Sequence, residues 1–273
     1  MLESRKREIR KQAYVLREKC KVSRYGIIDL FKECEKLGYK LLRYPLGENA
    51  DLGFVMKKDN DIVVFTNTST RLAREIFTLA HEIGHIVLHL ENVNSFIDDT
   101  ITIAGRSTDE KEQEANYFAS CLLMPEDEVN KFLDFEIADF AGKGLTAMDI
   151  ARIMSEFNVS FETALNRLEN LGKISRNERV RLDNERNQLR VGNLLRSVGG
   201  NQRLNEATEE IEIPYEYLEY VIFNYNHNAI PLETLERALK YYHLLIEDIS
   251  DKLVERKEDK EDDLDALLGG MED

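Results

Sequence analysis

One stretch decides how this chain folds: Phe77-Thr78-Leu79-Ala80-His81-Glu82-Ile83-Gly84-His85-Ile86-Val87-Leu88-His89. It closes a predicted helix, Arg71–His89, whose N-cap we expect at Ser69 or Thr70. Within this helix, apolar residues recur at spacings of four, three and four, at Ile76, Ala80, Ile83 and Val87. Such a stripe predicts a largely buried helix. Buried histidine and glutamate side chains then need hydrogen-bond partners or a metal ion.

The spacing of His81 and His85 indicates a metal site. Residues four apart lie on one helix face about one turn apart, so both imidazoles can reach a single ion. Zinc accepts nitrogen ligands in tetrahedral geometry, and a catalytic site leaves one position open for water. Glu82 follows the first histidine, where its carboxylate can take a proton from that water. We therefore predict one Zn²⁺ per chain, with Glu82 as the catalytic base.

The third ligand is expected from a different part of the chain. His89 continues the spacing, but it lies about 12 Å from His81 along a straight helix, too far for metal–nitrogen bonds of about 2.1 Å. A second predicted helix, Thr108–Met124, offers carboxylates at its start. Glu114 borders an apolar stripe in this helix, and a carboxylate in that position is costly unless it is paired or coordinated.

Two other acidic residues of the same helix compete with Glu114. Glu110 belongs to the fraying first turn, and Glu112 points away from the apolar stripe, so both read as solvated residues of an acidic helix start. We therefore predict a metal site of His81, His85 and Glu114. A donor to stabilise the oxyanion is also required, with Tyr117 or a further histidine as candidates.

Three segments in this order resemble the ImmA/IrrE metallopeptidases over about residues 25–175. The first is the stretch quoted above. The others are Glu114-Ala115-Asn116-Tyr117-Phe118-Ala119 with Leu122-Leu123-Met124-Pro125, and Ile150-Ala151-Arg152 through Phe157-Asn158-Val159-Ser160 to Ala164-Leu165-Asn166-Arg167-Leu168. The resemblance implies a compact zinc-peptidase fold, with ligands that fall here at His81, His85 and Glu114 and a catalytic Glu82. Family members are encoded on bacterial and phage genomes, often beside a helix-turn-helix repressor, and several act as anti-repressors.

The rest of the sequence predicts an α+β fold, a compact, mainly helical, gluzincin-like peptidase domain with a small sheet and an all-α C-terminal region. A helix is expected at Ser23–Gly38, then strands at Lys40–Tyr44, Gly53–Lys57 and Ile62–Thr66, and capped helices at Ala147–Phe157 and Phe161–Leu171. The polar residues 174–210 read as a linker or partly ordered helix. Residues 92–105 read as a loop packed beside the site.

The expected domains are a basic N-terminal helix (1–24), the peptidase domain (25–130), a helical support segment (131–175), a helical C-terminal domain for partner recognition (176–256) and an acidic disordered tail (257–273). The net charge of −15 argues against direct binding of nucleic acid. Three cysteines without a Cys-x-x-Cys pair, and no long apolar stretch, favour a cytoplasmic protein away from membranes.

These features predict a zinc metallo-endopeptidase that cleaves or inactivates a separate regulatory protein. The resemblance suggests a DNA-binding repressor as that protein. The alternative is a zinc-containing regulator that binds a repressor or transcription factor without cutting it.

Overall fold

The computed structural model describes residues 1–50, 52–58, 61–90, 110–137 and 144–254. Within the described residues the chain forms two compact units, one that ends at residue 212 and one that begins at residue 213. Helices dominate, and three strands form one small sheet, so the predicted α+β class is confirmed. The predicted loop 92–105 and tail 257–273 lie outside the described residues.

The sheet of the first unit has the order β1-β3-β2. Its strands are β1 (Lys40–Tyr44), β2 (Gly53–Lys58) and β3 (Asp61–Asn67), which agree closely with the three predicted strands. β1 runs parallel to β3, whereas β2 runs antiparallel to it. The central β3 contributes the buried Val64 and Phe65 to the core.

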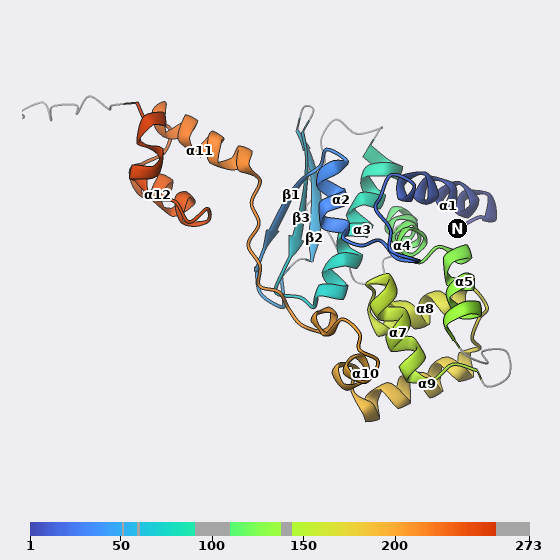
Figure 1. Ribbon diagram of the computed structural model, residues 1–273. Helices are drawn as coiled ribbons and strands as arrows, with labels where there is room; N and C mark the ends of the chain where they lie inside the picture. The colour runs from blue at the N-terminus through green and yellow to red at the C-terminus, as the bar shows by residue number, and fades with distance from the viewer. Residues whose placement is uncertain (51, 59–60, 91–109, 138–143, 255–273) are drawn as a thin grey trace, which may run out of the picture. The chain divides into compact units, whose positions relative to one another are not determined.

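Two helices cover one face of the sheet, α2 (Leu30–Lys36) beside β1 and α3 (Leu72–His89) beside β2 and β3 (Figure 1). The prediction for α2 was too long at its start, because the helix begins at Leu30, after the N-cap Asp29, whose side chain accepts from the Lys32 N–H. The preceding residues turn instead, since Glu156 of a distant helix accepts from the Tyr25 N–H.

The predicted cap of α3 was wrong. Arg71 is the N-cap and forms no side-chain cap hydrogen bond. The hydroxyl of Thr70 donates to the Asn67 carbonyl, and that of Ser69 reaches Glu209. Both predicted caps are therefore engaged by the turn between β3 and α3 and by the segment that packs on it.

Behind α3, away from the sheet, lie α4 (Glu110–Leu123) and then α1 (Glu3–Arg17) (Figure 1). The layers are therefore sheet, α3, α4 and α1. Side chains fully or almost fully buried between them include Ile9, Ala13, Leu79, Ile83, Phe118, Ala119 and Leu122. Because α4 packs on α3 and on α1, it is buried along two faces.

The remaining helices of this unit are α5 (Glu126–Glu136), α7 (Ala147–Phe157), α8 (Phe161–Asn170), α9 (Arg176–Leu189), α10 (Val191–Ser197) and the 3-10 turn η2 (Gln202–Asn205). Thr146 and Ser160 cap α7 and α8 as predicted. The segment 174–210, predicted as a linker or partly ordered helix, folds into α9, α10 and η2. Three leucines of that segment contribute to the core: Leu182, Leu194 and Leu195. Their burial was not predicted, because the residues around them are mostly polar.

After η2, residues 206–212 return to the sheet and the start of α3. The Leu72 N–H donates to the Glu206 carbonyl, and Arg43 exchanges two backbone hydrogen bonds with Glu212 at 2.8 and 3.0 Å. This segment, called the strap below, therefore occupies the outer edge of β1 at Arg43.

The second unit consists of α11 (Tyr215–Asn226), α12 (Leu232–Lys240) and the 3-10 helix η3 (Ile246–Lys252). It has its own small core, formed by Leu218, Val221, Ile222, Leu235, Ala238, Leu239 and Ile249.

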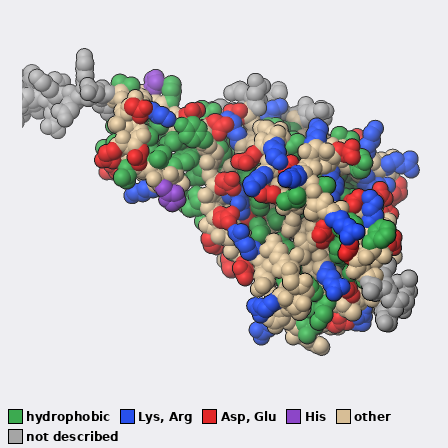
Figure 2. Space-filling view, in the orientation of Figure 1, with side chains coloured by type: hydrophobic (Ala, Val, Ile, Leu, Met, Phe, Trp, Pro, Cys, Tyr) green, Lys and Arg blue, Asp and Glu red, His purple; other side chains and the backbone are tan. Residues whose placement is uncertain are grey.

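Across both units, none of the described helices combines the length and apolar character needed to cross a membrane. On the face of the first unit seen in Figure 2, basic and acidic side chains are interspersed.

Candidate metal centre

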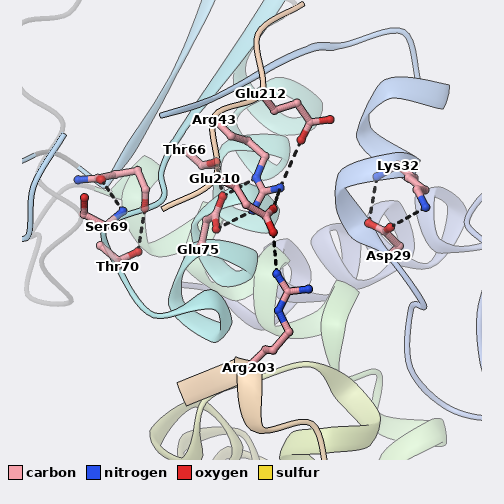
Figure 3. A network of polar contacts seen from close by, with 11 residues as sticks. Asp29, Lys32, Arg43, Thr66, Ser69, Thr70, Glu75, Arg203, Glu210 and Glu212 are labelled. Atoms are coloured by element: carbon pink, nitrogen blue, oxygen red, sulfur yellow. Dashed lines mark hydrogen bonds and ion pairs between the residues drawn. The ribbon is translucent and has the colours of Figure 1, made fainter. Parts of the chain in front are cut away.

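The start of α3 is fastened to the sheet by a buried ion pair (Figure 3). Arg43 of β1 donates to both carboxylate oxygens of Glu75, at 2.7 and 3.1 Å, and Thr66 of β3 donates to the same carboxylate at 2.9 Å. Burial alone would lower the pKa of Arg43, but its hydrogen bonds to Glu75 and to the strap residue Glu210 raise it above its ordinary value. Glu75 is 0% exposed and fully partnered, so this cluster sets the position of α3.

Two turns further along, α3 approaches α4 closely at Gly84. A Cβ atom on Gly84 would lie 3.1 Å from the Phe118 ring and 3.2 Å from the Ala115 backbone. Those distances leave almost no room for a side chain, so the absence of one lets the two helices meet here. Gly84, the small residue next to His85, thus allows α4 to pack closely against α3.

This close approach brings one carboxylate to the two histidines. Oxygens of Glu112 lie 3.2 Å from His81 Nε2 and 3.1 Å from His85 Nε2, and the two Nε2 atoms lie 3.0 Å apart. The three residues form the one group in the described part of the chain whose ligand atoms converge tightly enough to hold a metal ion. The structure therefore brings His81 and His85 together, as predicted, and adds Glu112.

Glu114, the predicted third ligand, does not reach this cluster. Its carboxylate accepts two hydrogen bonds from Arg5 of α1, at 2.8 and 2.6 Å, and contacts His89 at 3.2 Å. Arg5 is the main reason that the pKa of Glu114 lies below its usual value. The apolar residues of α4 were expected on a single face, whereas α4 is buried on two, and Glu114 lies on the side that meets α1.

A sequence signal for Glu112 exists in its spacing from Asn116. The two lie four residues apart and therefore on one face of α4. The Asn116 Oδ1 atom lies 3.1 Å from His81 Nδ1. An amide oxygen only accepts, so this contact favours the neutral tautomer of His81 with its proton on Nδ1, in which Nε2 can bind a metal ion. The pair Glu112 and Asn116 thus supplies a carboxylate and an orienting group to the same site.

The donor set fits a metal ion. Two ligand atoms bound to one ion by bonds of about 2.1 Å lie at most about 4.2 Å apart, and the three donors here are 3.0–3.2 Å apart. One Glu112 oxygen, Oε2, has no hydrogen-bond partner of good geometry among the described residues, although His81 Nε2 is within contact distance. Burial raises the pKa of Glu112, but the two histidines lower it by more, so it lies well below its usual range.

Glu82 stands beside this cluster with an open oxygen. The residue is 2% exposed, and its Oε1 atom has no hydrogen-bond partner among the described residues. Burial raises the pKa of its carboxyl to about 7. The first residue of β2, Gly53, is so close that a Cβ atom there would lie 3.4 Å from that oxygen. The predicted base is thus held between the metal ligands and the edge of the sheet.

Two further predictions concern neighbouring side chains. His89 lies outside the converging group, and its ring instead contacts His85 and Glu114. The Tyr117 hydroxyl, a candidate oxyanion donor, accepts from Arg10 of α1 at 2.9 Å. It therefore points into the interface between α4 and α1, so the structure does not place it with His81, Glu82 and His85.

Two histidines and a carboxylate thus converge in a donor set that suits a metal ion, beside the buried Glu82. Residues 34–169 match the family model described as the IrrE N-terminal-like domain, a peptidase domain, and the chain belongs to this family. The resemblance to ImmA/IrrE metallopeptidases is thereby confirmed. A search of the curated proteins gives no match. The matched residues run from the end of α2 to α8, so α1, the strap and the second unit lie outside them.

Proposed function

We propose that this protein is a zinc-dependent endopeptidase in which His81, His85 and Glu112 hold the metal. One observation carries the proposal: three ligand atoms converge beside Glu82, a buried carboxylate with an unpartnered oxygen. Two imidazole nitrogens and one carboxylate oxygen form a donor set that zinc accepts in catalytic sites with a position left open. This set replaces the one expected from the sequence at a single residue, Glu112 for Glu114.

Zinc bound at these residues would polarise the scissile carbonyl and lower the pKa of a water molecule. The chain itself must then move the proton. Glu82 accepts it from the attacking water and returns it to the leaving amine. Because burial raises the pKa of its carboxyl, Glu82 holds a proton more firmly than an exposed glutamate and can return it to the amine.

The sheet offers one edge for an extended peptide. At the outer edge of β1, the strap already pairs with Arg43. β2 is the other edge, and no described residue pairs with its outer side. Because Gly53 of β2 adjoins Glu82, a peptide that adds to this edge would pass beside the base and the metal ligands. We therefore assign the outer edge of β2 to substrate binding.

The proposed substrate is a separate cytoplasmic regulatory protein, a helix-turn-helix repressor that the peptidase cleaves or inactivates. This part of the proposal rests on the resemblance to the ImmA/IrrE metallopeptidases, whose members often act as anti-repressors. The interspersed charges on the visible face of the first unit and the net charge of −15 agree with a protein substrate rather than nucleic acid.

Two experiments test the two parts separately. Zinc-loaded full-length protein is incubated with a proteome-derived peptide library, and new termini are identified by mass spectrometry. Cleavage is expected from the wild type and is expected to disappear with Glu82→Gln or after chelation, returning when zinc is restored. Library cleavage that persists at the wild-type level in Glu82→Gln would contradict the assigned mechanism.

The substrate is tested with a reporter under a repressor encoded beside this protein's gene. Wild-type protein should relieve repression and shorten the repressor, and Glu82→Gln should do neither while it still binds zinc. If Glu82→Gln relieves repression fully, the protein acts by binding, which is the non-proteolytic alternative.

A further inference from the structure

A row of polar contacts leads away from the metal ligand His85 toward the N-terminal helix. His85 Nδ1 lies 3.0 Å from Nδ1 of His89, and Nε2 of His89 lies 3.2 Å from a Glu114 oxygen. Arg5 of α1 then donates to both oxygens of Glu114 at 2.8 and 2.6 Å. Every residue in the row beyond His85 is thus joined to the next by a side-chain contact.

The protons along this row can be arranged in one consistent way. When His85 Nε2 faces a metal, the proton of this ring is on Nδ1 and is donated to His89 Nδ1. The proton of His89 is then on Nε2 and is donated to Glu114, which accepts from Arg5 as well. The direction of every hydrogen bond therefore follows from metal binding at His85, and each donor meets an acceptor.

The row lies in a protected environment where such bonds matter most. His89 is 8% exposed and Glu114 is 7% exposed. A neutral His89 ring can accept from His85 and donate to Glu114 at the same time, so both of its nitrogens are partnered. A buried ring without partners would instead leave two nitrogens unsatisfied, at a cost in stability.

The two histidine ligands differ in how they are held. The side chain of His81 is 0% exposed, and Asn116 orients it directly from α4. The His85 side chain is 17% exposed, so packing constrains it less. Its orientation depends on His89, and that of His89 depends on Glu114. His85, the less buried ligand, therefore depends on more residues for its orientation than His81 does.

The last member of this chain of support comes from α1, outside the residues matched by the family model. Three arginines of α1 contact α4 in succession: Arg5 reaches Glu114, Arg10 reaches the Tyr117 hydroxyl, and Arg17 donates to the Leu122 carbonyl. Only the first of these contacts continues to the metal ligands. The helix thus binds α4 at three points and supports the metal centre through one.

We propose that His89, Glu114 and Arg5 form a positioning relay that fixes the ring orientation and proton of His85 for metal binding. The relay makes α1 a working part of the metal centre and not only a covering helix. It rests on the proposed function, because it presupposes that His85 is a metal ligand. Outer partners of this kind typically change metal affinity by about 10–100-fold.

Zinc affinity of the full-length protein, measured by competition with a chromogenic chelator, tests the relay. His89→Phe keeps an aromatic ring but removes both hydrogen bonds, and it should weaken zinc binding about 10–100-fold. His89→Gln can accept from His85 through its carbonyl and donate to Glu114 through its amide, so it should recover most of that affinity. With Co²⁺ in place of zinc, His89→Phe should also alter the visible absorption spectrum, which reports the ligand geometry.

A matched pair on α1 keeps the test decisive even if His89→Phe fails to fold. Arg5→Met and Arg10→Met each remove one hydrogen-bonding arginine between α1 and α4. Arg5→Met should weaken zinc binding about 3–10-fold, whereas Arg10→Met should leave it within about twofold of the wild type. Equal zinc affinities for these two variants, or wild-type affinity in folded His89→Phe, would overturn the relay.

Failure of the proposed function has a different signature. If His81→Ala binds zinc as tightly as the wild type, the ligand set itself is wrong, whatever the relay variants show. If His81→Ala loses zinc while Arg5→Met and Arg10→Met behave alike, the metal site stands and the relay does not.

Discussion

Helix α3 carries two buried glutamates seven residues apart, and their surroundings are opposite. Glu75, at the start of the helix, is 0% exposed, and Arg43 and Thr66 occupy its oxygens. Glu82 is 2% exposed, and one of its oxygens has no partner among the described residues. Burial of a carboxylate therefore does not by itself mark a reactive site. The incomplete pairing of Glu82, next to converging ligands, does.

The clusters around Glu75 and Glu82 also have different roles in α3. The closed cluster around Arg43 connects β1, β3, α3 and the strap, so it holds the helix in place (Figure 3). The open cluster consists of Glu82 and of His81, His85 and Glu112, whose ligand atoms can take up a metal ion. Helix α3 carries three of these four residues, and the closed cluster holds that helix in position. A fully partnered cluster stabilises the fold, while an underpaired one lowers stability in return for function.

Replacing Glu82 or Glu75 with glutamine changes one carboxylate oxygen into an amide nitrogen. Of all the variants, these two should differ most from each other in activity and stability. Glu82→Gln should reduce cleavage of a peptide found in the library by about 10²–10⁴-fold in kcat/KM, because it removes the proton acceptor. It should not lower the free energy of unfolding of the metal-free protein, because it removes a poorly partnered buried acid.

Glu75→Gln should do the reverse. It should lower the free energy of unfolding by about 1–3 kcal/mol, because Arg43 loses its buried charged partner, and leave kcat/KM of the folded enzyme nearly unchanged. Denaturant unfolding and peptide kinetics on the two variants check both statements. Equal losses of activity in the two would mean that the two clusters do not have separate roles.

Removing the cation of the closed cluster should cost the most stability. Arg43→Met leaves the Glu75 charge buried without its partner, so we expect a loss of about 3–5 kcal/mol in the free energy of unfolding. The double variant Arg43→Met with Glu75→Met should recover most of that loss, since no uncompensated charge remains. Urea unfolding of the single and double variants measures this. A single variant as stable as the wild type would show that the pair does not fasten α3.

The open cluster is tested by its two nearby carboxylates. Glu112→Gln should weaken zinc binding by more than about 100-fold, the upper end of what outer partners contribute, because it alters a direct ligand. Glu114→Gln should weaken it only about 10-fold, because it acts through His89. Chelator competition on both variants ranks them, and the opposite ranking would return the ligand role to Glu114.

The contrast between the clusters explains how much the sequence could predict. His81, Glu82 and His85 follow from spacing within one helix, and the three strands follow from local alternation between polar loops. The spacing of Glu112 from Asn116 does not by itself distinguish Glu112 from Glu114, because which of them faces the histidines depends on the rotation of α4 against α3. α4 is buried on two sides, so its apolar pattern marks no single face, and Glu114 faces α1 instead. The start of α2 was also misjudged, because the residues before it form a turn in which Tyr25 donates to Glu156, far along the chain.

The smallest effect is expected at the exposed end of the closed cluster. Arg203 donates to Glu210 at 2.6 Å and appears in Figure 3 as part of the same network as Arg43. Its side chain is 64% exposed and that of Glu210 is 43% exposed, so water and salt screen their attraction. Arg203→Ala should therefore lower the free energy of unfolding by less than about 0.5 kcal/mol in urea titrations at physiological salt. A loss near that of Arg43→Met would mean that the strap is held by its exposed charges, and that the stability of the cluster does not come from its buried core.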